Sequence, residues 1–398
     1  MPTTTRALPF DRPDAMNPPL AYAELRDRTP VAPVITPDGQ LAWLVTSYDA
    51  VATVLSDPRF GMSPPGDALR GNDTLFQDGE AHARLRRLVT KAFTARSIAA
   101  LRPRIEQLAT GYVAAIVDAG PPADLVAGLA APLPIMVISE LLGVAIGERE
   151  HFRGLVDAVS APNPFAFDHE GEAAAQAMQA WKALGGYAAE LVAAKRVKHK
   201  GLGDDLLSAL IAVRDTDDGR LSDNELVAMA TTLVAAGYLT TCNAISVGTI
   251  QLITEGRLAA LATDPDQVEA IVEEVLRRQS GLTGEALPRW AHDDLELAGV
   301  SIATGDRVLV RLEAANRDPA HFADPDRFVP GRRSSPHLAF GRGPHYCLGA
   351  ALARLEVGAA LRALAQQLPN LQLQVPVGDI VWTHSHTDPG PSALHVTW

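Results

Sequence analysis

The stretch FGRGPHYCLG, residues 340–349, decides how this chain is interpreted. It places three glycines around the start of a predicted helix over 348–368, as expected where the backbone must approach another group closely. Cys347 would lie at the N-terminus of that helix, where amide donors and the helix dipole favour a thiolate over a thiol. A thiolate with no second cysteine nearby is typical of an axial ligand to haem iron, so the loop predicts Cys347 as a metal ligand.

Two other kinds of site fit the same residues less well. The spacing Gly341-x-Gly343 begins a dinucleotide fingerprint, but Tyr346 occupies the third glycine position and no βαβ unit surrounds the loop. A zinc site would need about four clustered Cys or His ligands, which the sequence lacks. The other cysteine, Cys242, lies in an apolar segment and is interpreted as a small buried hydrophobic residue.

Composition limits the function classes. The chain has 398 residues, of which 47% are hydrophobic and 21% charged, as in a globular protein with a large core. Its 35 Lys and Arg against 47 Asp and Glu give a net charge of −12, which argues against a nucleic-acid partner. Two cysteines exclude a disulfide framework and favour a reducing cytoplasm. The first residues lack the apolar region of a signal peptide or membrane anchor.

One uncharged segment, Leu226–Thr254, is long enough to imitate a membrane span. It contains many threonines, is bounded by Glu225 and Glu255, and lacks an aromatic belt and flanking Lys or Arg. We therefore predict a long helix buried at the centre of the protein rather than a membrane span. A capping box of Ser222 and Glu225 would start this helix, and Gly256 would end it.

The remaining pattern is mainly helical with a small β portion. No repeat or linker divides the chain, so we predict a single domain over 1–398. A hairpin is predicted over Leu295–Leu312 with its turn at Thr304-Gly305. Other predicted strands are Val31–Ile35, Ala42–Thr46, Leu371–Val375 and Ala393–Trp398, and other predicted helices are Tyr48–Leu55, Glu80–Phe93, Ile98–Ala119, Leu125–Leu142, Glu148–Ser160, Glu172–Lys195, Asp204–Val213 and Asp266–Arg278.

Three motifs occur together in one order. Residues 340–349 match F-G-x-G-x-H-x-C-x-G, Glu274 and Arg277 match E-x-x-R, and Asp324–Phe328 matches a meander motif. On these residues the sequence resembles the bacterial soluble (class I) cytochrome P450 family over nearly its whole length. The resemblance implies the P450 fold, with a long central distal helix and a proximal helix after the cysteine loop. It also implies that Arg327 completes a buried Glu–Arg–Arg cluster with Glu274 and Arg277.

The resemblance implies haem b (iron protoporphyrin IX) as the cofactor. Its two propionates need cations, and by family position these are His82, Arg86, Arg289 and His345. Further haem contacts implied by the motifs are Phe340, Gly341, Gly349 and Ala236.

The distal helix departs from the family pattern. The family usually has A-G-x-[DE]-T-[TS] at a kink of this helix, and there the acid–alcohol pair helps relay protons to the oxygen activated at the haem. Here Leu239 replaces the acid before Thr240 and Thr241, and leucine cannot carry a proton. These three residues are the catalytic candidates. Protons would come from water held by the threonines, from Glu285 or from the substrate, or the oxidant would form by another route.

The resulting hypothesis is a haem-thiolate monooxygenase acting on a small organic, natural-product substrate that is free or bound to a carrier. Electrons would pass from NAD(P)H through ferredoxin reductase and ferredoxin, with Arg84, Arg87 and Arg342 as a docking patch. One alternative is an enzyme using peroxide or nitric oxide, and another is a haem-bearing accessory protein that binds a carrier without turnover. Substrate contacts are expected from Gly61–Phe76, Pro162–His169, Gly281–Leu287 and Thr383–Ser392.

Overall fold

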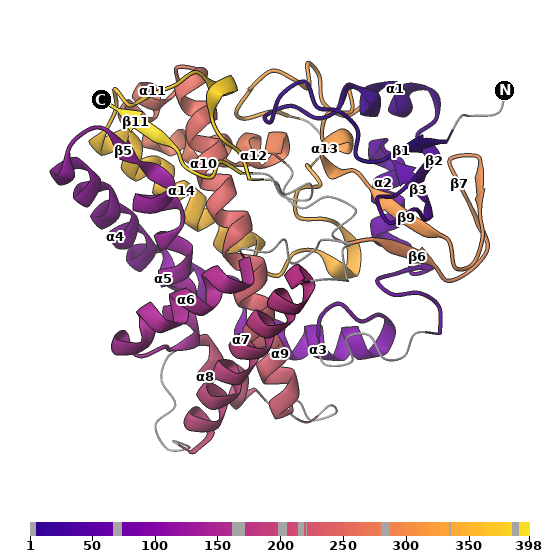
Figure 1. Ribbon diagram of the computed structural model, residues 1–398, viewed down its shortest axis with the longest axis horizontal. Helices are drawn as coiled ribbons and strands as arrows, with labels where there is room; N and C mark the ends of the chain where they lie inside the picture. Colours follow the sequence, from indigo (N-terminus) through magenta and orange to yellow (C-terminus); the bar gives the residue numbers. More distant parts are fainter. Residues whose placement is uncertain are drawn as a thin grey trace.

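A helical region and a smaller β region make up the protein (Figure 1). The computed structural model describes residues 5–66, 74–160, 172–197, 205–213, 219, 221–279, 287–333, 336–383 and 390–398. The helices in this part of the chain are α1 Leu20–Arg28, α2 Tyr48–Ser56, α3 Gly79–Ala92, α4 Ala95–Ala119, α5 Pro132–Leu142, α6 Arg149–Ser160, α7 Glu172–Val197, α8 Leu206–Ala212, α9 Asp223–Gly237, α10 Leu239–Thr254, α11 Leu258–Thr263, α12 Val268–Gln279, α13 Leu312–Ala315 and α14 Ala350–Gln367.

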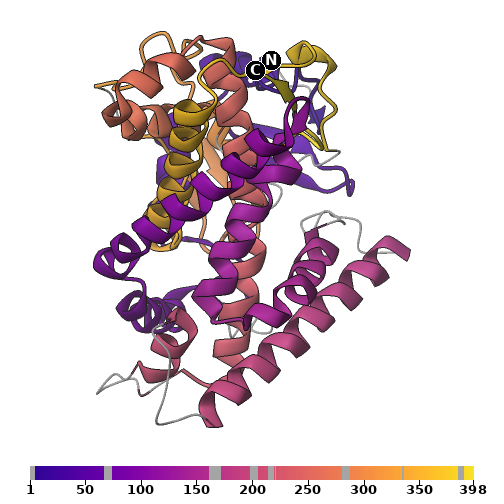
Figure 2. The same ribbon diagram turned by 90° about the vertical axis from the view of Figure 1, so that its left-hand side faces the viewer.

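Helix α14 lies at the centre of the helical region. It packs against α4, α10, α11 and α12, and Figure 2 shows it beside α4. Small residues allow these close approaches: a Cβ on Gly248 of α10 would lie 3.1 Å from Val275 of α12 and 3.4 Å from Leu361 of α14. The helix that follows the cysteine loop is therefore fixed on several sides by the hydrophobic core.

The predicted central helix is buried but is not continuous. Ser222 and Glu225 form the predicted capping box at the start of α9. Tyr238, with ψ of −72°, then separates α9 from α10, so the predicted long helix is divided in two. The break lies within Ala236–Thr241, where the resemblance implied a kink. Among the described residues, Asp223–Thr254 is the one stretch long and apolar enough to cross a membrane, and 67% of its most apolar window is buried inside the protein. This extent of burial agrees with the prediction of a helix in the protein core.

The main sheet has six strands in the order β1-β2-β3-β9-β6-β4. Its strands β2 and β3 form an antiparallel pair in which Val31 lies opposite Val45. A second sheet joins β10, β11 and β5 near the C-terminus, as the predicted terminal pair requires. The strands are β1 Arg6–Ala7, β2 Val31–Ile35, β3 Leu41–Val45, β4 Phe60–Gly61, β5 Ala123–Asp124, β6 Arg289–Ala291, β7 Leu295–Leu297, β8 Val300–Ile302, β9 Arg307–Val310, β10 Gln372–Leu373 and β11 His395–Thr397.

The predicted turn of the 295–312 hairpin is wrong. Strands β7 and β8 pair through a turn at Ala298 and Gly299, which have φ of 49° and 80°. Two consecutive positive φ values match the twist of a two-residue hairpin. Gly305, at φ 90°, instead redirects the chain into β9, which pairs with β3 and β6 in the main sheet. The predicted helix over Leu125–Leu142 is likewise divided, into a π-helical turn over Val126–Ala130 and α5.

Candidate active site

The cysteine loop is closed by a backbone hydrogen bond and packs against α2. The backbone N–H of Cys347 donates to the carbonyl of Phe340 over 2.9 Å. Gly341 and Gly343 have φ of 71° and 72°, backbone angles that residues with a side chain rarely adopt. A Cβ on Gly343 would also meet the carbonyl of Leu55 and lie 2.9 Å from the Cα of Ser56. Glycine is therefore required at 343 both by backbone conformation and by space.

The loop presents Cys347 just before α14, as predicted. Its side chain is exposed to solvent, although the surrounding protein raises the pKa of its thiol through desolvation. The backbone amides of Gly349 and Ala350 and the charges of Arg86 and Arg354 act in the opposite direction but do not outweigh desolvation. The predicted contribution of the amide donors is therefore present, and the ionisation of Cys347 at the iron stays a prediction. A coordinated metal ion is what deprotonates such a thiol outright.

Helix α3 brings two of the predicted propionate ligands against the cysteine loop. The ring of His82 lies 4.1 Å from the ring of His345, and its Nε2 is 3.2 Å from the carbonyl of Pro344. Arg86 donates to the carbonyl of Tyr346 over 2.7 Å.

Arg289 is deeply buried on β6 at the same site. Its guanidinium donates to the carbonyls of Leu287 and Pro288 at 2.8 and 3.3 Å, and burial lowers its pKa to about 10. Within the described part of the chain, no carboxylate forms an ion pair with it; the charge of Asp78 acts on it from further away. A buried guanidinium without an ion-pair partner is costly, so this position suits an anion.

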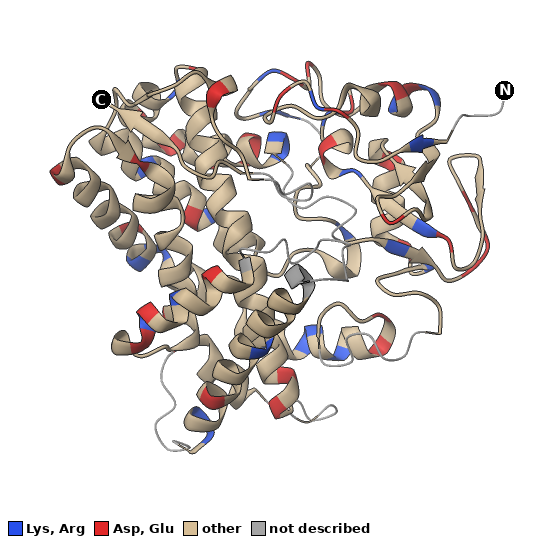
Figure 3. Cartoon of the chain, in the orientation of Figure 1, with Lys and Arg blue, Asp and Glu red and all other residues tan. Residues whose placement is uncertain are grey.

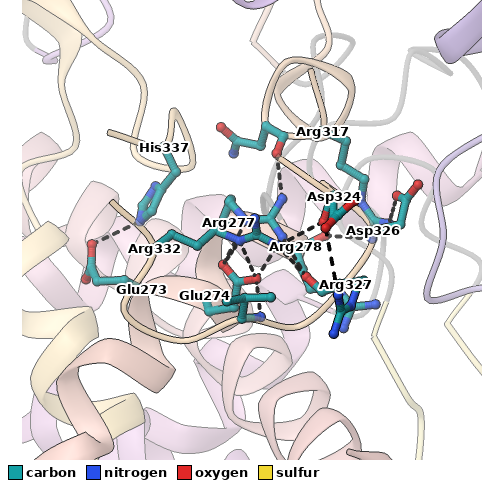
Figure 4. A network of polar contacts seen from close by, with 12 residues as sticks. Glu273, Glu274, Arg277, Arg278, Arg317, Asp324, Asp326, Arg327, Arg332 and His337 are labelled. Atoms are coloured by element: carbon teal, nitrogen blue, oxygen red, sulfur yellow. Dashed lines mark hydrogen bonds and ion pairs between the residues drawn. The ribbon is translucent and has the colours of Figure 1, made fainter. Parts of the chain in front are cut away.

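A buried charge cluster fixes the segment that leads into the loop (Figure 4). Both carboxylate oxygens of Glu274 accept from Arg277, at 2.8 and 2.9 Å. The second guanidinium is that of Arg332, whose Nε lies 3.0 Å from Glu274 Oε1. The same oxygen accepts the backbone N–H of Val329 over 2.8 Å.

The assignment of Arg327 to this cluster is wrong. Its side chain is 77% exposed and forms an ion pair with Asp324 at 3.7 Å. Asp324 has φ of 45° and begins a turn in which the N–H of Arg327 returns to its carbonyl. That turn directs the Arg327 side chain outward, while its carbonyl accepts from both Arg277 and Arg332. The guanidinium of Arg332, further along the chain, binds Glu274 of α12 instead.

The distal candidates lie at the break between α9 and α10. The hydroxyl of Thr240 donates to the carbonyl of Ala236 over 2.7 Å and is partly accessible. Thr241 is buried, and Leu239 packs partly buried against the core. Tyr238 points toward α6, where its hydroxyl donates to Asp157 over 3.2 Å. Glu285, Pro162–His169, and parts of the other three expected substrate segments lie outside the described residues.

Comparisons with known proteins agree with this arrangement. A family model described as Cytochrome P450 matches residues 12–260 and 266–386. The chain belongs to the cytochrome P450 family. It is 40% identical over 394 residues to the cytochrome P450 monooxygenase PikC of Streptomyces venezuelae, covering 96% of this chain and 92% of that protein. It is 39% identical over 402 residues to the mycinamicin IV hydroxylase/epoxidase of Micromonospora griseorubida, covering 99% and 98%.

A solved structure confirms the predicted fold. The LnmA cytochrome P450 hydroxylase from the leinamycin biosynthetic pathway of Streptomyces atroolivaceus matches with a TM-score of 0.88 and 36% identity, over 99% of this chain and 100% of that chain. This P450 is an oxidoreductase of the monooxygenase type, with haem b as its cofactor, and its relatives act in secondary metabolism.

The residues of this P450 fit that cofactor. Arg289 is a buried cation without an ion-pair partner in the described chain, and Arg86, also desolvated, has a lowered pKa for the same reason. Both are suited to propionates. For a Cβ on Gly349, the nearest atom would be the Sγ of Cys347, at 4.0 Å. The thiol is therefore not crowded on that side.

Replacing Arg289 tests the propionate assignment. A charge-assisted hydrogen bond contributes about 1.5–3 kcal/mol, so Arg289→Ala should weaken haem retention by about 10- to 100-fold. Transfer of haem to an excess of apomyoglobin measures this. Arg289→Lys keeps the charge, so its haem retention should lie between that of the wild type and that of Arg289→Ala. The Soret position should be the same in all three proteins. Undiminished retention with a shifted Soret band would contradict the assignment.

Asp78 was not predicted from the sequence, although it contacts His345, one of the predicted propionate ligands. Asp78 precedes α3, and its carboxylate lies 3.1 Å from Nε2 of His345 and accepts the N–H of Met62. Desolvation opposes these bonds, yet together they lower the pKa of Asp78. The one sequence signal was its position immediately before α3, where an Asp is common as an N-cap.

Proposed function

We propose that this P450 inserts one oxygen atom from O2 into a small natural product in the cytoplasm. Electrons would come from NAD(P)H through ferredoxin reductase and ferredoxin. The proposal rests on the pairing of two features that a haem requires. The thiol of Cys347 is presented before α14, and the buried guanidinium of Arg289 suits an anion. The relatives support it, since the names of PikC and the mycinamicin enzyme describe a monooxygenase and a hydroxylase.

The site residues divide into two groups. Cys347 would hold the iron, and His82, Arg86, Arg289 and His345 would hold the propionates. The haem would further contact Phe340, Gly341, Gly349 and Ala236. When bound, the haem supplies the redox chemistry that activates O2.

Thr240 is proposed to hold a water molecule on the distal side. Its hydroxyl proton is committed to the carbonyl of Ala236, so its oxygen is left to accept a hydrogen bond from water or from a substrate hydroxyl. Leu239 excludes water beside it. Thr241 is buried and does not share this accessible position. The proton route would therefore pass through water or substrate at Thr240 rather than through an acidic side chain at 239.

The three arginines of the proposed ferredoxin surface differ in their surroundings. Arg84 forms an ion pair with Glu225 of α9, so its charge is already neutralised. Arg87 on α3 and Arg342 in the cysteine loop are both exposed, and Figure 3 shows the basic residues of α3 together. These two cations favour an acidic partner on this face of a protein whose net charge is −12.

Coupling between NADH consumption and product formation tests the proposed proton route. Thr240→Ala should divert most of the reducing equivalents into hydrogen peroxide, because the group that orders water is lost. Leu239→Glu introduces an acid at the same turn and should change the coupled fraction or its pH dependence. The measurement is product formed per NADH consumed, with a surrogate ferredoxin and reductase. Thr240→Ser, which keeps the hydroxyl at the same position, is the matched control and should behave nearly as the wild type.

Two outcomes would revise the proposal. Equal ratios for the wild type, Thr240→Ala and Leu239→Glu would show that this break does not deliver protons. Turnover with peroxide alone, or with nitric oxide and NADH, but not with ferredoxin, would replace the O2-dependent activity. A carrier-bound substrate would be indicated if a carrier-linked form of the substrate is turned over and the unlinked form is not.

A further inference from the structure

A second ion-pair network, separate from that of Glu274, lies against the cysteine loop. Its centre is Glu273, the neighbouring residue on α12. Glu273 Oε1 lies 2.5 Å from Nε of Arg354, and Oε2 accepts from the same guanidinium over 3.0 Å. Oε2 is also 3.1 Å from Nε2 of His337, which precedes the loop. One carboxylate thus joins α12, α14 and the segment that enters the loop.

Arg354 extends this network across the cysteine loop. Its guanidinium carbon lies 4.5 Å from the ring centroid of Phe340, the residue whose carbonyl accepts the N–H of Cys347. Its Nη1 donates to the hydroxyl of Tyr346 over 3.4 Å and to the carbonyl of Ala350 over 3.3 Å. The guanidinium therefore contacts residues on both sides of Cys347 in the sequence.

Both members of the pair are charged at neutral pH. Desolvation alone would raise the pKa of Glu273, but the hydrogen bonds from His337 and Arg354 hold it at about 2. The same carboxylate raises the pKa of Arg354 against desolvation. Arg354 is one of the two cations whose charge acts on Cys347. Its side chain is 32% exposed and that of Glu273 46%, so solvent screens part of their effect.

We propose that Arg354 is a positioning residue for the iron ligand Cys347 and that Glu273 holds Arg354 in place. The two side chains fix the loop through Phe340 and Tyr346, and their opposite charges set the electrostatic field at the ligand. The proposal rests on the proposed role of Cys347. It gives Glu273 a function that the adjacent Glu274, bound to Arg277 and Arg332, does not share.

The reduction potential of the holoenzyme separates an electrostatic role from a merely structural one. Arg354→Gln removes a positive charge and leaves the negative charge of Glu273, so the ferric form is favoured and the potential falls. Glu273→Gln leaves the positive charge of Arg354, so the potential rises. Partly screened charges at this range should change the equilibrium constant for one-electron reduction by about threefold to tenfold, tenfold being about 59 mV. A dye-mediated titration measures both variants.

Two further variants serve as controls. Arg362→Gln removes an arginine from the same helix, where it pairs with Glu106 at 3.4 Å, and should leave the potential unchanged. Arg354→Lys keeps the charge but loses the planar fork that lies on Phe340 and binds Glu273 in two places. It should keep a potential near that of the wild type, while the thiolate-type spectrum of its reduced CO complex decays faster.

Shifts of the same sign in Arg354→Gln and Glu273→Gln, or shifts no larger than that of Arg362→Gln, would overturn the proposal. If Arg354→Gln loses its haem, Glu273→Gln still decides, because an unchanged or lowered potential there contradicts the inference. The titration uses chemical mediators and needs neither ferredoxin nor substrate. Failure of ferredoxin-driven turnover would therefore count against the proposed function alone.

Discussion

Glu274→Ala is expected to give protein that holds haem poorly and unfolds with a free energy lower by about 3–5 kcal/mol. The side chain of Glu274 is 3% exposed, and that of Arg277 is 2% exposed. Removing the carboxylate leaves two guanidiniums, those of Arg277 and Arg332, without their common anion. It also removes the acceptor of the Val329 N–H, which ties the meander to α12. Haem occupancy and the denaturant midpoint of the purified protein measure the effect.

Arg332 and Arg327 form a matched pair for this prediction. Arg332→Ala should reproduce most of the loss, since its guanidinium binds Glu274 and the carbonyls of Asp324 and Arg327. Arg327→Ala removes an exposed ion pair, which contributes about 0–1 kcal/mol, and should leave haem binding intact. Full haem occupancy and unchanged melting in Glu274→Ala would rule out the network. Equal costs for the two arginines would contradict the assignment of Arg332.

The pH dependence of stability gives the same network a second test. Desolvation opposes ionisation of Glu274, but the bonds from Arg277, Val329 and Arg332 lower its pKa below the ordinary 4.5. A lowered pKa means that the stabilisation is present above pH 4.5 and is lost as the pH falls below it. The wild type should therefore lose more stability than Glu274→Ala on acidification from neutral pH, measured by denaturant midpoints.

Features fixed by a few neighbouring residues were predicted well from the sequence. The capping box of Ser222 and Glu225 formed as expected, because both of its hydrogen bonds lie within one turn. Cys242 is buried in α10, in agreement with its apolar surroundings. Cys347 precedes α14 because the glycine-rich loop and the apolar periodicity that follows are both local signals.

Features that depend on the path of the chain were predicted poorly. Arg327 and Arg332 lie close together in the sequence, and only the turn begun at Asp324 determines which of them faces α12. The break at Tyr238 lies in an apolar segment with no proline, so periodicity alone gave no signal for it, and only the family motif over Ala236–Thr241 indicated a kink there. The contacts of Arg354 with Glu273 and Phe340 join three separate elements, and no spacing in the sequence indicates them.

Cys347→Ser is expected to abolish thiolate ligation and, with it, monooxygenase turnover. Cys347 is the cysteine that the loop presents before α14, whereas Cys242 is buried within α10. A serine hydroxyl has a much weaker tendency to ionise than a thiol and is not an axial ligand of the common haem classes. Cys242→Ser is the control, because it makes the same chemical change at a position that no loop presents. It should retain the wild-type spectrum with at most a modest loss of stability.

The absorbance spectrum of the reduced CO complex tests the ligand role of Cys347. It is recorded on the wild type, Cys347→Ser and Cys242→Ser at equal haem content. We expect a thiolate-type Soret maximum for the wild type and for Cys242→Ser, and its complete loss in Cys347→Ser. A thiolate-type maximum that persists in Cys347→Ser would show that another residue holds the iron and would contradict the assignment of the site.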